Sequence, residues 1–147
     1  MAGEISKAAH ALMSSLLQRK RVLLLGKQDD IRTWMAVALM QYQAGSRFHV
    51  AMAGDNPARK NNPEAVKAMA EIGIDMALHQ PESALVAAQE YRPDIMIAMS
   101  DDIEIPVIPG ALTSVWDLPD PRHAPTELIV QIREQIREKV IRLAQAK

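Results

Sequence analysis

The chain has 147 residues, of which 48% are hydrophobic, so it is long enough for one domain with a substantial core. Its 17 basic and 18 acidic residues leave a formal net charge of −1, which gives no overall attraction to nucleic acid or to an anionic membrane. Cysteine is absent, which excludes disulfides, thiolate metal sites and every cysteine-based mechanism.

The sequence also bears on location. It contains no apolar run near the roughly 18–20 residues that a membrane-spanning helix needs. The N-terminal residues do not resemble a signal peptide, because Glu4, Lys7 and His10 interrupt their apolar residues. A cytoplasmic location without membrane contact is the resulting expectation.

The first part of the chain predicts helices and strands in alternation. Apolar residues at helical spacing predict an amphipathic helix over residues 4–18. The continuous apolar run over 21–25 is typical of a strand that is covered on both faces. A helix is expected over 32–42 and a second strand, "FHVAMA", over 48–53.

The second part continues this alternation. Asn62 is a good N-cap residue, Pro63 suits a first helical turn and Gly73 suits a helix C-terminus, so a helix is expected between them. The remaining patterns predict, in chain order, a helix over 82–91, strands over 94–100 and 113–116, and a helix from Thr126 with an apolar stripe of Ile129, Ile132, Ile136, Val140 and Leu143.

Strands that alternate with helices favour a parallel sheet with helices on both faces. The expected fold is therefore an α/β three-layer sandwich around a four-stranded parallel sheet. In such sheets ligands bind beyond the carboxyl ends of the strands. The loop after Leu25 lies at such an end, and Arg32 at the start of the next helix is suited to holding an anion.

Several motifs resemble the low-molecular-weight protein tyrosine phosphatases and, more closely, their thioredoxin-coupled arsenate reductase relatives. The motif Arg32-Thr33, followed by Met35-Ala36, matches the end of that family's C-x5-R-S/T loop and the start of its helix. "NPEAVKAMAEIGID" over 62–75 and "WDLPDP" over 116–121 are similar to later family segments, and the resemblance makes Asp120 the counterpart of the general acid.

This resemblance implies a phosphotyrosine phosphatase I-like fold and a division of the chain. Residues 21–147 would form the phosphatase or reductase-like domain, and residues 1–20 would be an N-terminal helical extension. The apolar stripe of that extension would pack either on its own sheet or on a second copy, giving a homodimer.

The position of the family's nucleophile is the main departure. Counting back six residues from Arg32 places Gly26 where the family has its cysteine. The reductases' additional redox cysteines near the third strand also have no counterpart in "MSDDIEIPVIPG". The resemblance thus implies a pseudophosphatase in which Gly26, Arg32 and Asp120 are degenerate catalytic positions, with no catalytic residue, cofactor or metal expected.

The loop itself leaves anion binding open. The candidate anion-binding residues are Lys27, Gln28, Arg32 and Thr33. Two carboxylates oppose them, because one like-charge pair at about 4 Å and an effective dielectric near 20 costs roughly 4 kcal/mol. These carboxylates belong to Asp29 and Asp30, and an internal ion pair of Arg32 with Asp29, Asp30 or Asp120 is the alternative to anion binding.

Two functional hypotheses follow. The first is a regulatory module that binds a protein partner or a small oxyanion, in which Trp34 is either an anchor at the rim of the site or a core residue. The alternative is a remodelled enzyme that uses Asp29, Asp30 and Asp120 for metal-assisted phosphoryl transfer or hydrolysis. Nucleic-acid binding by the cluster over 19–21 is a weaker idea and is not expected.

Overall fold

The computed structural model describes residues 8–9, 19–26, 31–53, 62–79, 87–121 and 125–146. Of the helix predicted over 4–18, only Ala8 and Ala9 are described, and both are helical and exposed. The rest of that prediction lies outside the described residues. Within the described ranges, no helix is both long enough and apolar enough to cross a membrane.

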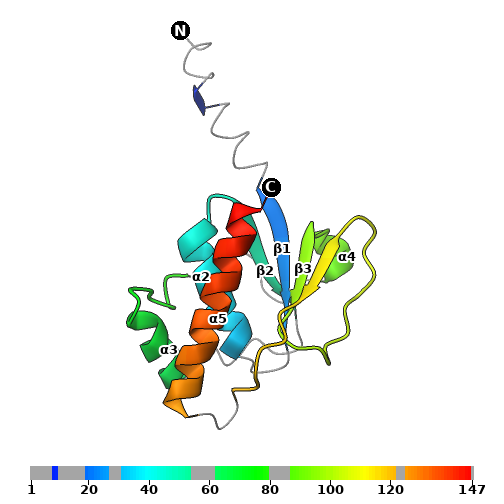
Figure 1. Ribbon diagram of the computed structural model, residues 1–147. Coiled ribbons are helices and arrows are strands. Elements are labelled where there is room, and N and C mark those ends of the chain that lie inside the picture. Colours follow the sequence, from blue (N-terminus) through cyan, green and yellow to red (C-terminus); the bar gives the residue numbers. More distant parts are fainter. Residues whose placement is uncertain are drawn as a thin grey trace.

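Four parallel strands form the central sheet, which confirms the predicted architecture (Figure 1). Their order is β2-β1-β3-β4. β1 is the hub, since it pairs with β2 on one side and with β3 on the other. The strands are β1 (Lys20–Leu25), β2 (Phe48–Ala53), β3 (Ile95–Ala98) and β4 (Leu112–Val115).

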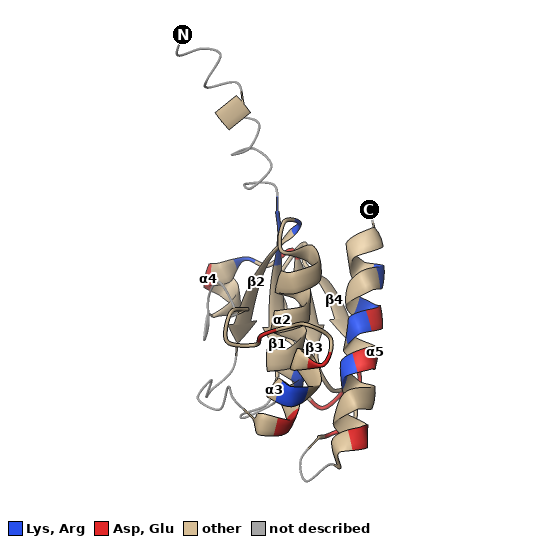
Figure 2. Ribbon diagram, turned by 90° about the vertical axis from the view of Figure 1, so that its left-hand side faces the viewer, with Lys and Arg blue, Asp and Glu red and all other residues tan. Residues whose placement is uncertain are grey.

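Helices cover both faces of the sheet (Figures 1 and 2). One face carries α2 (Ile31–Ala44), α3 (Pro63–Ala70) and α5 (Thr126–Gln145), and the other carries α4 (Ala88–Tyr91). α2 is buried over most of its length because it lies between the sheet and α5, which packs on it. The larger core cluster fills this layer, and a smaller cluster lies beneath α4.

The helix after Asn62 forms as its sequence predicts. The Oδ1 atom of Asn62 accepts hydrogen bonds from the backbone N–H groups of Glu64 and Ala65, at 3.0 and 3.1 Å. Gly73 follows the helix with a φ of 82°, a conformation that glycine adopts without a steric cost.

The apolar stripe of α5 is also confirmed. Its isoleucines and Val140 are buried in the core, and Leu143 is half-buried. Arg133 lies beside this stripe and is buried too. Its Nη1 atom donates to the carbonyl of Ala68 at 2.9 Å and to the carboxylate of Glu71 at 2.9 Å, which joins α5 to α3.

The helix predicted over 82–91 needs correction. Ala87 is extended, with φ −80° and ψ 135°, so the helix does not run unbroken through it and begins at Ala88. The helix ends at Arg92, whose φ of 56° is left-handed. Pro93 follows directly, and it disfavours a helical conformation at the residue before it. Residues 81–86 lie outside the described residues.

Candidate functional site

The candidate site lies at the carboxyl edge of the sheet, where β1, β3 and β4 end side by side. The backbone N–H of Met99, just after β3, donates to the carbonyl of Leu25 at the end of β1, at 3.1 Å. After β4, the N–H of Trp116 donates to the carbonyl of Ala98 at 2.8 Å. The N–H of Leu118 donates to the carbonyl of Met99 at 3.0 Å. The segments that follow the three strands therefore begin next to one another.

Gly26 lies at this edge. It follows the buried end of β1 directly and is itself half-buried. Lys27, Gln28, Asp29 and Asp30, which the sequence places in the loop, lie outside the described residues. The chain is described again from Ile31, the first residue of α2.

Arg32 joins two distant parts of this edge. It is the second residue of α2 and only 3% exposed. Its Nη1 atom donates to the backbone carbonyl of Leu118 at 2.7 Å and to that of Pro119 at 3.3 Å. The guanidinium therefore connects the first turn of α2 to the "WDLPDP" segment through main-chain oxygens.

Thr33 also lies in the first turn of α2. It is 2% exposed, and its hydroxyl oxygen is buried without a hydrogen-bond partner. A buried hydroxyl without a partner costs roughly 1–3 kcal/mol relative to one that is hydrogen-bonded. The sequence predicted that Thr33 helps to bind an anion, and the structure adds that its hydroxyl makes no hydrogen bond.

The "WDLPDP" segment is fixed in place by alternate residues. Trp116 and Leu118 are buried in the core, whereas Asp117, Pro119 and Asp120 are exposed. Asp117 has a φ of 40°, in the left-handed region that aspartate tolerates better than most residues. Asp120 is exposed, and Arg32 donates to the carbonyls of the two residues before it. The structure therefore brings Arg32 and Asp120, two predicted site residues, to the same region.

Ser100 was not singled out from the sequence. It follows β3, is buried, and its Oγ atom donates to Oδ1 of Asp102 at 2.7 Å. Its place directly after an apolar run was the available signal, because strand ends are where polar site residues gather in parallel sheets.

Of the two roles considered for Trp34, the structure excludes the partner-binding anchor at the rim of the site. The indole is 8% exposed and belongs to the larger core cluster. The physical reason is the position of α2 between the sheet and α5, which buries every residue from 31 to 40 and leaves no open side at Trp34. Trp34 has the core-packing role.

No group of three His, Asp or Glu side chains within the described ranges is placed to hold a metal ion. The metal-assisted hypothesis relied on Asp29 and Asp30 together with Asp120. Asp29 and Asp30 lie outside the described residues, so the structure does not place them relative to Asp120.

These features define a class of protein: a three-layer α/β domain whose site is a strand–loop–helix turn at the carboxyl edge, with a buried arginine in the first turn of the helix. The sequence profile of the low molecular weight phosphotyrosine protein phosphatases matches residues 21–147. The chain belongs to this family.

Among relatives, arsenate reductase 1 of Staphylococcus epidermidis is 26% identical over 131 residues, which cover 84% of this chain and 95% of the relative. A solved arsenate reductase in its oxidized state has a TM-score of 0.71 and 25% identity over 85% of this chain and 96% of its own. The thioredoxin-dependent arsenate reductase Cg_ArsC1' of Corynebacterium glutamicum has a TM-score of 0.64 and 28% identity, over 97% of this chain and 74% of its own.

Proposed function

We propose that this chain is a catalytically inactive member of its family that binds a small tetrahedral oxyanion at the turn between β1 and α2 and acts as a regulatory module. The relatives described above are named as arsenate reductases, so the loss of activity has to be argued from this chain's own residues.

The argument for inactivity is chemical. The family's mechanism, as the resemblance implies it, needs a thiolate that attacks the bound oxyanion, and this chain has no cysteine at any position. Gly26 follows the strand directly, at the position to which the resemblance assigns that thiolate, and glycine has no side chain that could attack. The arginine and the helix that follow it remain.

The buried hydroxyl of Thr33 is the observation that carries the proposal of anion binding. The first backbone N–H groups of an α-helix have no partner within the helix and attract anions. α2 is 14 residues long and has no acidic residue in its first turn. A tetrahedral oxyanion at this helix end would offer an acceptor to the Thr33 hydroxyl, which has none in the unliganded protein.

The link through Arg32 supports a regulatory role. An anion at the start of α2 would bind close to Arg32, the second residue of that helix. The guanidinium of Arg32 donates hydrogen bonds to the carbonyls of Leu118 and Pro119. Anion binding would then change the position of this segment, which carries the exposed residues Asp117 and Asp120. The signal would be read by another molecule, since no reaction follows.

Calorimetric titration with phosphate, sulfate and arsenate, beside turnover assays, tests this proposal. We expect binding of at least one oxyanion, weakened tenfold or more in Thr33→Val. Neither p-nitrophenyl phosphate hydrolysis nor arsenate reduction with thioredoxin should exceed the background without protein. Turnover in either assay would contradict inactivity, and absence of heat with all three anions would contradict binding. Hydrolysis that requires Mg²⁺ would support the remodelled enzyme with Asp29, Asp30 and Asp120 instead.

A further inference from the structure

β4 is an open edge of the sheet. It is the outermost strand, and all four of its residues are exposed, in contrast to the buried residues of β3 beside it. Leu112 is 68% exposed and Val115 is 43% exposed. Val107, in the segment that leads into this strand, is 90% exposed. The edge therefore displays apolar side chains as well as backbone.

The backbone of β4 offers hydrogen-bonding groups on its open side. The N–H of Leu112 donates to Asp94 and that of Trp116 donates to Ala98, at 2.9 and 2.8 Å, so these residues direct their donors at β3. Alternate residues of a parallel strand bond to the same neighbour. Thr113 and Val115 accordingly direct their N–H and C=O groups away from β3, toward the free edge.

The sequence of this edge lacks the usual protection against pairing. Exposed edge strands commonly carry charged residues or proline, which oppose pairing with another strand. The run over 111–116, "ALTSVW", contains neither. The strand is therefore competent to accept a further strand from another molecule.

The charges at the two ends of the sheet point to the partner. At the amino ends of the strands, the guanidinium of Arg21 lies 4.1 Å from the centre of the Tyr91 ring and donates to the Tyr91 carbonyl at 2.9 Å. Arg47 donates to the carbonyl of Ala144. These partners are neutral, so the positive charges are retained, and Figure 2 shows the basic residues at the start of β1 at the upper end of the sheet. The cations of this end are Lys20, Arg21, Arg47 and Arg92, and the acidic residues near them are Glu90 and Asp94.

The carboxyl ends of β3 and β4 carry the opposite charge. Asp101 and Asp102 follow β3, Asp117 and Asp120 follow β4, and all four are exposed. Each molecule thus has a basic amino edge and an acidic carboxyl edge along the direction of its strands.

We propose that two copies of this chain pair their β4 strands in antiparallel orientation about a two-fold axis, joining two four-stranded sheets into one. The antiparallel arrangement places the acidic carboxyl edge of each copy beside the basic amino edge of the other, at both ends of the contact. A parallel pairing would place like charges together. A two-fold contact is also closed, so the assembly stops at the dimer.

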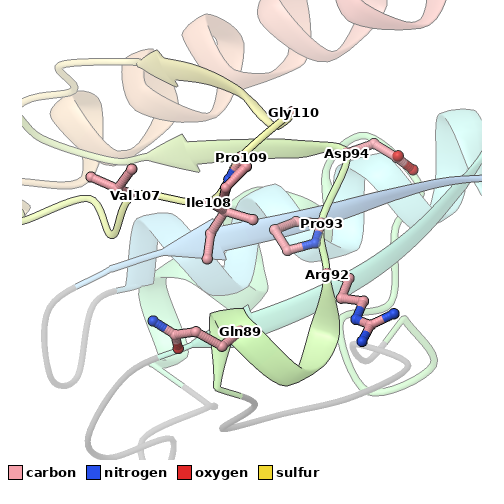
Figure 3. Close-up of a pocket in the computed structure, with 8 residues that line it drawn as sticks. All are labelled: Gln89, Arg92, Pro93, Asp94, Val107, Ile108, Pro109 and Gly110. Atoms are coloured by element: carbon pink, nitrogen blue, oxygen red, sulfur yellow. The ribbon is translucent and has the colours of Figure 1, made fainter.

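A hollow at the amino end of β4 extends this surface. It has a volume of about 500 Å³ and lies between α4 and the segment that precedes β4 (Figure 3). Arg92, Pro93, Val107 and Pro109 are among the residues that line it. In the antiparallel dimer, residues 117–120 of the second copy arrive at this end of the strand, where the hollow offers them apolar walls, the cation of Arg92 and, beside it, the carboxylate of Asp94.

The contact is small, because a four-residue ladder supplies little of the roughly 1,200–2,000 Å² that stable interfaces bury. The dimer should therefore form in the micromolar range and dissociate on dilution. Its opposed charges should make it weaker as salt is raised, since salt screens exposed charges.

Sedimentation velocity of the full chain across low to high micromolar concentrations tests the proposal. The key variant is Thr113→Pro, which removes an N–H from the open edge and leaves the ladder to β3 intact. Its matched control is Thr113→Val, which keeps that N–H. A second variant, Val115→Lys, adds a charge at a side chain that is already solvent-accessible, so it tests the interface even if the proline variant fails to fold.

We expect a monomer–dimer equilibrium in the native protein and in Thr113→Val, and at least a tenfold higher dissociation constant in Thr113→Pro and in Val115→Lys. In Arg92→Asn/Asp117→Asn, which removes one charge from each edge with a residue that tolerates positive φ, the salt dependence should become shallower. A protein that stays monomeric at every concentration would overturn the proposal. So would a dimer that survives both β4 variants but is lost in Leu16→Glu, because the predicted N-terminal helix would then be the interface.

Discussion

Arg32 and Leu118 are 86 positions apart in the chain, yet the guanidinium Nη1 of one lies 2.7 Å from the carbonyl oxygen of the other. This hydrogen bond is buried and involves a charged donor, which places it among the stronger ones. It fixes the segment after β4 relative to the first turn of α2. Arg32 therefore has a structural role whether or not an anion is bound.

Replacing Arg32 by alanine should lower the free energy of unfolding by roughly 2–4 kcal/mol, because a charge-assisted hydrogen bond and the packing of the side chain are both lost. Urea titration of the purified protein measures the change. Arg142→Ala is the control, since its side chain is exposed and its ion pair with Glu138 should contribute at most about 1 kcal/mol. Equal effects of the two substitutions would argue against the structural role of Arg32.

Thr33→Val should have the opposite effect on stability. The substitution keeps the shape of the side chain and removes a buried hydroxyl without a partner, so the free energy of unfolding in oxyanion-free buffer should stay constant or rise by up to about 1 kcal/mol. Thermal unfolding without added phosphate measures this. A loss of more than about 1 kcal/mol would show that the hydroxyl already has a favourable contact in the free protein.

The loop carboxylates should oppose anion binding. Asp29→Asn/Asp30→Asn removes two negative charges that the sequence places directly before the start of α2, and each removal relieves at most roughly 4 kcal/mol of repulsion, the value for a close pair at an effective dielectric near 20. We expect at least tenfold tighter phosphate binding, and the gain should shrink at high salt. Calorimetry at two salt concentrations provides the measurement. Unchanged or weaker binding would place these carboxylates away from the anion or in a role that supports it.

Arg133 offers a test of the contact between α3 and α5. Its guanidinium is buried and donates to Ala68 and Glu71, so Arg133→Ala should cost roughly 2–4 kcal/mol of stability. Glu71→Ala removes only the half-exposed acceptor and should cost less than about 1 kcal/mol. Chemical denaturation of both variants compares them. A larger loss in Glu71→Ala would assign the contact to the ion pair and not to the carbonyl of Ala68.

Much of the fold could be predicted because local signals agreed with tertiary packing. Asn62, Pro63 and Gly73 each act within one helical turn, so their effect is readable without knowledge of the rest of the chain. The buried strand at 22–25 was readable for a similar reason, since a strand covered on both faces is apolar at every position.

The remaining features depend on contacts that no local pattern encodes. The burial of Trp34 follows from α5 packing on α2, elements separated by most of the chain. Two hydrogen bonds of Arg32 end on backbone carbonyls, and every residue carries such a carbonyl, so the sequence suggested only the acidic side chains as partners. The exposure of β4 likewise follows from strand order, which places it at the edge of the sheet.

The central claim is that the site still binds an oxyanion although the attacking atom is gone. Thermal unfolding of the full chain with and without millimolar phosphate tests it most directly, beside Thr33→Val as the matched variant. Phosphate at 100 times its dissociation constant should add about 2.7 kcal/mol of stability, and the melting temperature of the native protein should rise by several degrees while the variant shifts far less. Equal shifts in both proteins, or none in either, would contradict the account.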